Sequence, residues 1–249
     1  MRIAFSGTSS AVAAADSGFT SFIISNGEVL ILVDASGNPV QSILKMGLDP
    51  CDLDIVILTH YHADHISGYP ALIQTLSCMN RKKELRVLSD NLTRQKARAL
   101  IHLLELNTDK LGFSLTYLSE FKTPGISISL VPGHHSVPSS MVKVRDRTTS
   151  LFYTSDTVSC PEIAASARGV KVLAHEATAS HTNLPVLEKD GHSSAYQAGE
   201  TATKAGVEML LLCHICWNQY PDSKSVVEEA GRSFSGKIIL PELFRWYDL

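Results

Sequence analysis

One short segment of the chain, "THYHADHISG" (residues 59–68), concentrates side chains that can bind metal. His60 and His62 are separated by one residue, so in an extended chain both side chains leave on the same face and can hold one ion. Four polar residues in a solvated loop would be the simpler interpretation. Because four potential ligands occupy six positions after an apolar run, the pattern favours a metal site.

The second half of this segment can reach a second ion. Asp64 and His65 are expected in a turn, ahead of a helix that begins near Ile66. Imidazole nitrogen and carboxylate oxygen together suit zinc, with manganese or iron as alternatives. Two neighbouring cations lower the pKa of a water molecule and stabilise charge on a phosphoryl or carbonyl oxygen, so the reaction class indicated is hydrolysis.

Four local residues cannot complete two sites, so the rest of the chain must supply further ligands. Several apolar runs end directly in ionisable residues, and such strand ends can converge on one edge of a sheet. The candidates at these ends are His60, His134, His135, Asp156, His175, Glu176 and His214.

The elements that must position these residues form a mixed α/β chain. Short β-branched or aliphatic runs bounded by Gly, Pro, Asp or Asn predict strands, among them "RIAFSG", "SFIIS", "VLILVDA", "LDIVILTH", "ISISLVPG", "SLFYTSD", "VKVLAHE" and "EMLLLCH". Helical patterns lie between some of them, including "PVQSILKMG", "GYPALIQTLSCMN", "LTRQKARALIHLLEL", "CPEIAASARG", "SSAYQAGETATKAG" and "SVVEEAGRSF". Two sheets packed face to face with helices outside would accommodate this distribution.

Composition restricts the class of protein. The 249 residues are 44% hydrophobic and 19% charged, with no repeat or long linker, which indicates one globular domain spanning residues 1–249. A net charge of -3 argues against a broad cationic surface for nucleic acid, although Arg81-Lys82-Lys83 and Arg94, Lys96 and Arg98 are local candidates. Five cysteines without framework spacing, and no signal or membrane-spanning stretch, favour the cytoplasm.

The motif His60-x-His62-x-Asp64-His65 resembles the signature of the metallo-β-lactamase superfamily. The similarity covers most of the chain: "SGTSSA", then residues 31–76, and then "YTSDT", "LAHEAT", "GHSSAYQAGE" and "LLLCHI" resemble the ribonuclease Z group in order. The resemblance implies an αββα sandwich with the metal site at one sheet edge.

The resemblance also implies a role for each candidate. His60, His62 and His135 would hold one metal, Asp64, His65 and His214 the other, and Asp156 would bridge them. Both ions are expected to be zinc, with manganese as the alternative. "HSVP" after the second of two adjacent histidines favours His135 over His134. Glu176 and His192 match a proton-transfer pair, in which the histidine protonates the leaving oxygen and the carboxylate sets its tautomer.

Two departures bear on the substrate. The ribonuclease Z group carries a long arm that binds tRNA, whereas "SVPSSMVKVRDRTTSLFYTS" between His135 and Asp156 fits a plain hairpin. The group's Ser-x-Arg-Tyr after the last histidine is replaced by "ICWNQYPD", in which Tyr220 matches but no arginine does. Relatives without the arm include a cyclic phosphodiesterase of phosphonate breakdown.

The function indicated is therefore a dinuclear metal phosphodiesterase, with hydroxide held by the metals attacking phosphorus and Asp64 orienting it and accepting a proton. The substrate would be a small or cyclic phosphodiester or an RNA 3′ end, without a membrane partner, and the resemblance implies a homodimer. Hydrolysis of a lactone or thioester, and non-catalytic binding of nucleotide or RNA, are the alternatives.

Overall fold

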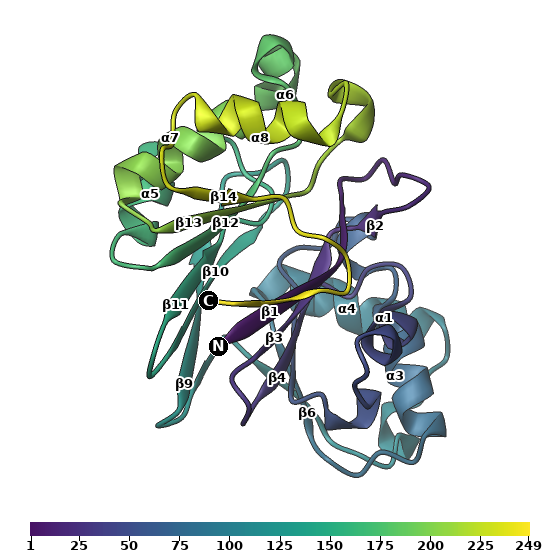
Figure 1. The fold of residues 1–249 in the computed structure, drawn as a ribbon. Coiled ribbons are helices and arrows are strands. Elements are labelled where there is room, and N and C mark those ends of the chain that lie inside the picture. The colour runs from purple at the N-terminus through teal and green to yellow at the C-terminus, as the bar shows by residue number, and fades with distance from the viewer.

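In the computed structural model, which describes residues 1–249 apart from the side chain of Leu187, two β-sheets pack face to face and helices cover both outer surfaces (Figure 1). The order of the layers is helices, sheet, sheet, helices. This arrangement is the mixed α/β sandwich expected from the sequence, so the predicted fold class is confirmed.

The first sheet is built mainly from the first half of the chain. Its strands follow one another in the order β15 (Trp246–Asp248), β1 (Arg2–Ser9), β3 (Ser21–Ser25), β4 (Leu30–Val33), β5 (Ile55–Ile57), β6 (Leu85–Leu88) and β7 (Leu115–Leu118), with β2 (Gly18–Phe19) beside β1. Strands β4 to β7 are parallel. Their carboxyl ends therefore lie along one edge.

The second sheet repeats this plan. Its order is β14 (Lys237–Ile239), β13 (Met209–Cys213), β12 (Val172–Glu176), β11 (Ser150–Tyr153), β10 (Ser140–Asp146), β9 (Ile126–Pro132) and β8 (Glu120–Lys122). Strands β11 to β14 are parallel, and the remaining pairs are antiparallel. Both sheets thus combine a parallel half with an antiparallel half.

Helices of the two halves cover opposite outer faces (Figure 1). The first sheet carries α1 (Pro39–Lys45), α3 (Tyr69–Cys78) and α4 (Asn91–Leu103), and the second carries α5 (Pro161–Ala167), α7 (Ala195–Ala205) and α8 (Ser223–Gly231). Two short helices, α2 (Ala63–Ile66) and α6 (Leu184–Asp190), and four 3-10 turns, Pro50–Asp52, Thr108–Lys110, His181–Asn183 and Trp217–Gln219, lie in connections.

Apolar side chains on alternate strand positions fill three layers. In β4, Leu30 and Leu32 pack under the helices, whereas Ile31 and Val33 face the other sheet. Such strands are buried on both faces, which explains their continuous apolar runs. Between the sheets, the ring of Phe22 lies 4.9 Å from that of Tyr153, centroid to centroid, and joins the two layers.

The segment after β5 differs from the sequence-based expectation. Asp64 and His65 belong to α2 rather than to a turn, and the next helix begins at Tyr69 instead of near Ile66. The break falls at Gly68, where a Cβ would lie 2.5 Å from the carbonyl oxygen of Gly37. Close approach of two backbones, which the pattern of apolar residues does not record, therefore separates α2 from α3.

The segment between His135 and Asp156 is a plain hairpin, as predicted, because β10 and β11 pair antiparallel from Val142 with Tyr153 to Arg145 with Ser150. The strands β2, β8 and β15 and the helix α6 were not expected. All four are short, and neither β2 nor β15 has a run long enough to show a period.

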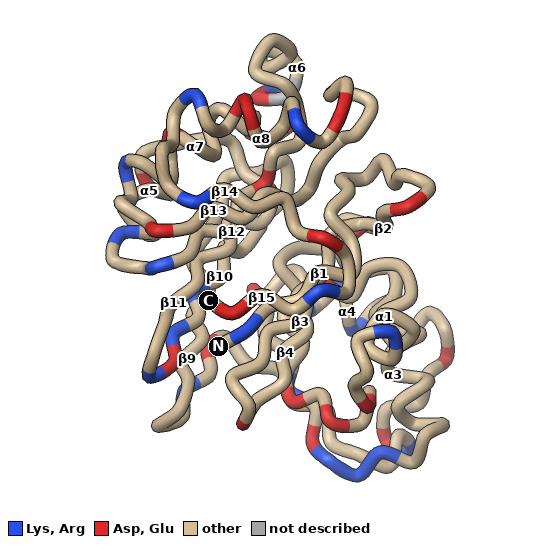
Figure 2. Tube along the Cα trace, in the orientation of Figure 1, with Lys and Arg blue, Asp and Glu red and all other residues tan. Residues whose placement is uncertain are grey.

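In the positively charged segment Arg81-Lys82-Lys83, which follows α3, the arginine has a structural role. Arg81 is 2% exposed and donates hydrogen bonds to the backbone carbonyls of Cys51, Leu53, Lys83 and Glu84. This segment lies at the opposite end of the molecule from α6 (Figure 2). Among the described residues, no helix is long and apolar enough to cross a membrane.

Candidate metal centre

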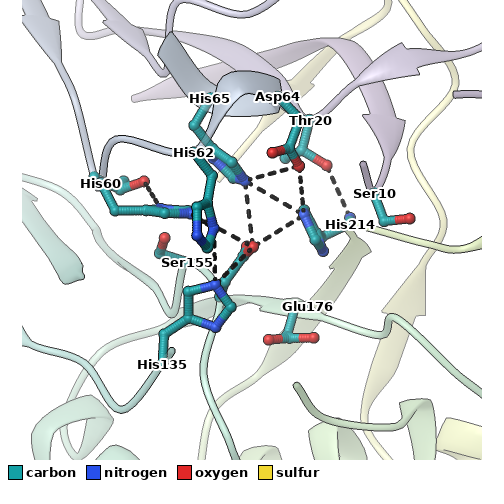
Figure 3. A network of polar contacts seen from close by, with 12 residues as sticks. Ser10, Thr20, His60, His62, Asp64, His65, His135, Ser155, Glu176 and His214 are labelled. Atoms are coloured by element: carbon teal, nitrogen blue, oxygen red, sulfur yellow. Dashed lines mark hydrogen bonds and ion pairs between the residues drawn. The ribbon is translucent and has the colours of Figure 1, made fainter. Parts of the chain in front are cut away.

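The predicted ligands meet at the edge where strands of both sheets end (Figure 3). The loop after β5 and helix α2 supply His60, His62, Asp64 and His65 from the first sheet. Loops after β9, β11 and β13 supply His135, Asp156 and His214 from the second sheet.

One group of potential ligands consists of His60, His62, His135 and Asp156, whose donor atoms all lie within 4.8 Å of one another. Nδ1 of His62 lies 3.1 Å from Nε2 of His60 and 3.1 Å from Nε2 of His135. His60 and His62 therefore face the same centre, as their spacing predicted.

A second group consists of Asp64, His65, His214 and Asp156. Nε2 of His65 lies 3.3 Å from Nε2 of His214, and Oδ2 of Asp64 lies 3.4 Å from each of these nitrogens. Each group thus combines ligands from both sheets, and Asp156 belongs to both.

The position of Asp156 tests whether a metal fits. Its carboxylate is 1% exposed, and Oδ2 lies 3.1 Å from Nε2 of His214 and 3.3 Å from Nε2 of His65. Oδ1 has no hydrogen-bond partner among the described residues. An unpaired buried polar atom costs about 1–3 kcal/mol, and more when it is charged, so a cation beside Asp156 would relieve a real penalty. The oxygen and nitrogen donors fit divalent metal ions.

The electrostatics of the two ligand groups that share Asp156 also favour positive charge between them. Burial raises the pKa of Asp156, but the nearby His214 and His65 outweigh it and hold this pKa well below the usual range. Burial likewise opposes a proton on His65, yet Asp156 and Asp34 hold its pKa well above the ordinary value. Burial and His65 together keep the pKa of His60 well below the ordinary value. The carboxylates of Asp156 and Asp34 therefore favour positive charge in this group, which a divalent cation would supply.

Four of the histidines are fixed by contacts at the ring nitrogen that faces away from the centre. Nδ1 of His60 contacts Oγ1 of Thr59 at 3.1 Å, and Nδ1 of His65 contacts Oδ2 of Asp34 at 2.8 Å. The imidazole of His135 donates from Nδ1 to the carbonyl oxygen of Gly191 at 2.8 Å.

The remaining contact joins Nδ1 of His214 to Oγ1 of Thr178 at 2.9 Å. Partners of this kind set the tautomer and orientation of a metal-binding histidine, and they leave Nε2 of all four rings toward the centre. His62 differs, because it faces the centre with Nδ1.

The residues that hold the outer ring nitrogens of these histidines were not predicted from the sequence. Asp34 directly follows β4, is fully buried, and also accepts hydrogen bonds from the amide and hydroxyl of Thr59 at 2.9 Å each. Its position after "VLILV" follows the same strand-end rule that identified Asp156, so this signal was available. Gly191 and Thr178 act through a carbonyl and a hydroxyl that no spacing marks.

A carboxylate and an imidazole form a pair beside the two groups. Nδ1 of His192 lies 3.2 Å from both carboxylate oxygens of Glu176, which also accepts hydrogen bonds from Thr178 Oγ1 at 2.7 Å and from the amides of Thr157 at 2.6 Å and Ser193 at 3.1 Å. Burial disfavours charge on His192, but Glu176 raises its pKa to about 9. Two of the sequence-predicted residues are thus brought together as a proton-holding pair.

Glu229 of α8 fixes the segment that carries His192. It is 7% exposed and accepts hydrogen bonds from the amides of His181 at 3.1 Å and Tyr196 at 3.2 Å and from Oγ of Ser180 at 3.2 Å. These residues stand on either side of α6. Glu229 therefore holds together the two ends of the segment 180–196, which contains α6 and brings Gly191 and His192 to the site.

The remaining candidates lie elsewhere. His134 is exposed and belongs to a separate group with Cys160 and Glu162, so the structure separates it from His135. His175 is buried on β12 and joins no ligand group among the described residues. Tyr220 donates its hydroxyl to the carbonyl of Ala179 and accepts from the amide of Ala195 at 3.3 Å, which is a structural role.

A cleft of about 450 Å³ opens over the cluster. Its lining includes Ser10, Ala11, Val12, Asp190 and His192, and it includes no Lys or Arg among the described residues. A larger hollow of about 1060 Å³ lies between α8 and the C-terminal segment and contains none of the predicted ligands. Chemistry rather than size therefore identifies the site.

Fold and site together define a four-layer sandwich protein with two ligand groups that share a carboxylate at the sheet edge. Residues 30–215 match the model of the β-lactamase superfamily domain, and the chain belongs to this family. The superfamily predicted from the sequence is thereby confirmed.

Three proteins are similar to this chain over almost its whole length. The ribonuclease Z of Methanothermobacter thermautotrophicus is 24% identical, over 94% of this chain and 92% of that protein. The metallo-β-lactamase fold protein YhfI of Bacillus subtilis superposes with a TM-score of 0.82 at 21% identity, over 99% of this chain and 98% of that one. A diphosphatase of the PhnP family superposes with a TM-score of 0.78 at 16% identity, over 100% of this chain and 97% of that one.

Proposed function

We propose that the protein is a metal-dependent hydrolase, a phosphodiesterase that uses two divalent cations at the sheet edge. The observation that carries this proposal is the sharing of Asp156 by two ligand groups, next to the proton-holding pair of Glu176 and His192. A relative named ribonuclease Z, aligned over almost the whole chain, supports phosphodiester chemistry.

His60, His62, His135 and Asp156 would hold one ion, and Asp64, His65, His214 and Asp156 the other. When bound, two such cations make a water molecule more acidic and stabilise charge on the phosphoryl oxygens. Zinc is the proposed metal, since imidazole and carboxylate donors suit it, and manganese is the alternative.

The residues of the chain would supply orientation and protons. Asp64 is 8% exposed at the cleft, where its carboxylate can orient the attacking water and accept its proton. Glu176 holds Nδ1 of His192, which leaves Nε2 of that ring to protonate the leaving oxygen. The ring of His192 packs on those of His135 and His214, with centroid distances of 4.9 and 5.3 Å, so it is positioned beside both groups.

A small phosphodiester fits the cleft better than a long RNA does. Polyanions are usually bound by Lys and Arg, and none is among the described residues that line the cleft, whereas the carboxylate of Asp190 stands at its wall. The hairpin of β10 and β11 has no extended arm that could hold RNA away from the site. We therefore propose a small or cyclic phosphodiester as the substrate, with an RNA 3′ end as the second candidate.

The test uses metal-replete protein and bis(p-nitrophenyl) phosphate. Asp64→Ala and His192→Ala should each lower its hydrolysis by at least about a hundredfold, because each removes a group that acts in proton transfer. Retention of full activity by both variants would contradict the mechanism. A panel with a cyclic nucleotide phosphate, a tRNA precursor, a lactone and a thioester separates the candidates, and turnover of the lactone or thioester alone would replace phosphodiester hydrolysis.

A further inference from the structure

Three ligating side chains gather outside the centre described above. His134, Cys160 and Glu162 offer an imidazole nitrogen, a thiol sulfur and a carboxylate oxygen that all lie within 4.8 Å of one another. They lie on the loop after β9 and at the start of α5, and none of them belongs to either group that contains Asp156.

We propose that His134, Cys160 and Glu162 form a third divalent-cation site, of zinc type, distinct from the dinuclear centre. Cysteine, histidine and glutamate are the three side chains that zinc binds most readily, and cobalt(II) occupies the same donor sets. Three protein ligands leave one position for water, so the site is more labile than a closed structural site.

Of the three side chains, Cys160 packs against the apolar cluster that includes Ile163 of α5, whereas His134 and Glu162 are exposed. Among the described residues, the imidazole of His134 has no hydrogen-bond partner, in contrast to the histidines of the dinuclear centre. Cys160 stands at the N-cap position of α5 but makes no capping hydrogen bond. Glu162 is exposed and interacts with the Cys160 thiol. Three donor atoms of different chemistry therefore converge at the start of α5.

The charges favour a cation as the missing partner. Burial raises the pKa of the Cys160 thiol, and the Glu162 carboxylate raises it further, first through a hydrogen bond with the thiol and then through repulsion of the thiolate, whereas the backbone amides of Ile163 and Glu162 lower it. A divalent cation between them would remove this repulsion, and the imidazole completes a donor set of mixed softness. The sulfur distinguishes this group from ordinary clusters of exposed acidic residues.

The backbone connects the third site to the dinuclear centre. The amide of His134 donates to Oγ1 of Thr157 at 3.2 Å, and its carbonyl accepts from the amide of Val158 at 2.8 Å. Thr157 and Val158 directly follow Asp156, and His134 directly precedes His135. A cation bound to His134 and Cys160 would therefore cross-link the two loops that carry the ligands from β9 and β11.

The experiment is a titration of the metal-free, full-length protein with cobalt(II), followed by absorption. The donors of the dinuclear centre are nitrogen and oxygen only, so a near-ultraviolet thiolate-to-cobalt charge-transfer band reports the third site alone. We expect the wild type to bind three equivalents and to show this band. Cys160→Ser should lose the band and the third equivalent and keep the other two.

Cys216→Ser is the matched control, because Cys216 is the cysteine that lines the cleft and it should leave the band unchanged. Glu162→Gln, a substitution at an exposed position, covers the case in which Cys160→Ser fails to fold, and it should weaken cobalt binding at the third site roughly tenfold or more. Absence of the band from the wild type, its persistence in Cys160→Ser, or its loss in Cys216→Ser would each overturn the proposal. Asp64→Ala should keep the band, which separates this outcome from any failure of the proposed hydrolysis.

Discussion

Replacing Asp34 by Asn should weaken metal binding without unfolding the chain. Oδ2 of Asp34 accepts the Nδ1 proton of His65, and Oδ1 accepts the amide and hydroxyl of Thr59. Asn would keep its oxygen toward Thr59 and turn its NH2 group toward His65. The ring must then accept at Nδ1 and carry its proton on Nε2, 3.3 Å from Oδ2 of Asp156, where a metal would bind. Asn tolerates the positive φ of 57° at this position.

The expected loss of metal affinity follows from the contact of Asp34 with a single proposed ligand, His65. Loss of an outer partner of a metal-binding histidine typically costs about 10–100-fold in metal affinity or activity, which is about 1.4–2.7 kcal/mol. The loss should fall on the group of Asp64, His65 and His214, because Asp34 touches no ligand specific to the other group. One of the two ions should therefore be released at a lower concentration of competing chelator.

The assay is competition with a chromogenic chelator, together with hydrolysis of bis(p-nitrophenyl) phosphate at fixed free zinc. Asp54→Asn is the matched control, since Asp54 also accepts a backbone amide, that of Leu30 at 2.9 Å, and pairs with Lys83 at 2.7 Å, and it belongs to neither ligand group. Unchanged affinity for both ions in folded Asp34→Asn would refute the assignment of Asp34 as the residue that sets the tautomer of His65.

Three further predictions concern the frame of the site. A Cβ at Gly191 would lie 2.6 Å from Nδ1 of His135, so Gly191→Ala should lower metal affinity and hydrolysis about tenfold or more, whereas Gly27→Ala, at a similar positive φ of 88° with nothing within 4 Å, should leave both unchanged. Glu229→Gln exchanges Oε2, which accepts from Oγ of Ser180 and the amide of His181, for a donor and should cost about 1–3 kcal/mol in the free energy of unfolding, measured with urea, together with a fall in kcat/KM. Removal of metal by a chelator should lower Tm by about 5–10 °C, since an ion at a hundred times its Kd contributes about 2.7 kcal/mol, and added zinc should restore it; an unchanged Tm by calorimetry would argue against bound metal.

Much of the site could be predicted because its residues stand at strand ends. His60, Asp156 and His214 each follow an apolar run that forms a buried strand, and parallel strands in a sheet bring their carboxyl ends to one edge. The period and length of these runs are local properties of the sequence. The fold class followed from the same runs and from the helical patterns between them.

The contacts that orient the ligands could not be predicted in this way. Asp34 lies 31 residues before His65, and Gly191 lies 56 residues after His135. Such pairs are created by packing. Here β4 lies beside β5, and the segment that contains α6 packs on the loop after β9. The helix α2 was also missed, because four residues are too few to display a helical period, and its end depends on the close contact at Gly68.

The distribution of the proposed ligands between the sheets would give bound metals a structural role as well. The group with His60 and His62 takes His135 from the second sheet, and the group with Asp64 and His65 takes His214 from it, while Asp156 serves both. Each ion would therefore join one sheet to the other at the edge where the apolar layer between them ends. Metal removal should for this reason loosen the site edge before the core around Phe22, and hydrogen exchange should rise first in the loops after β5, β11 and β13.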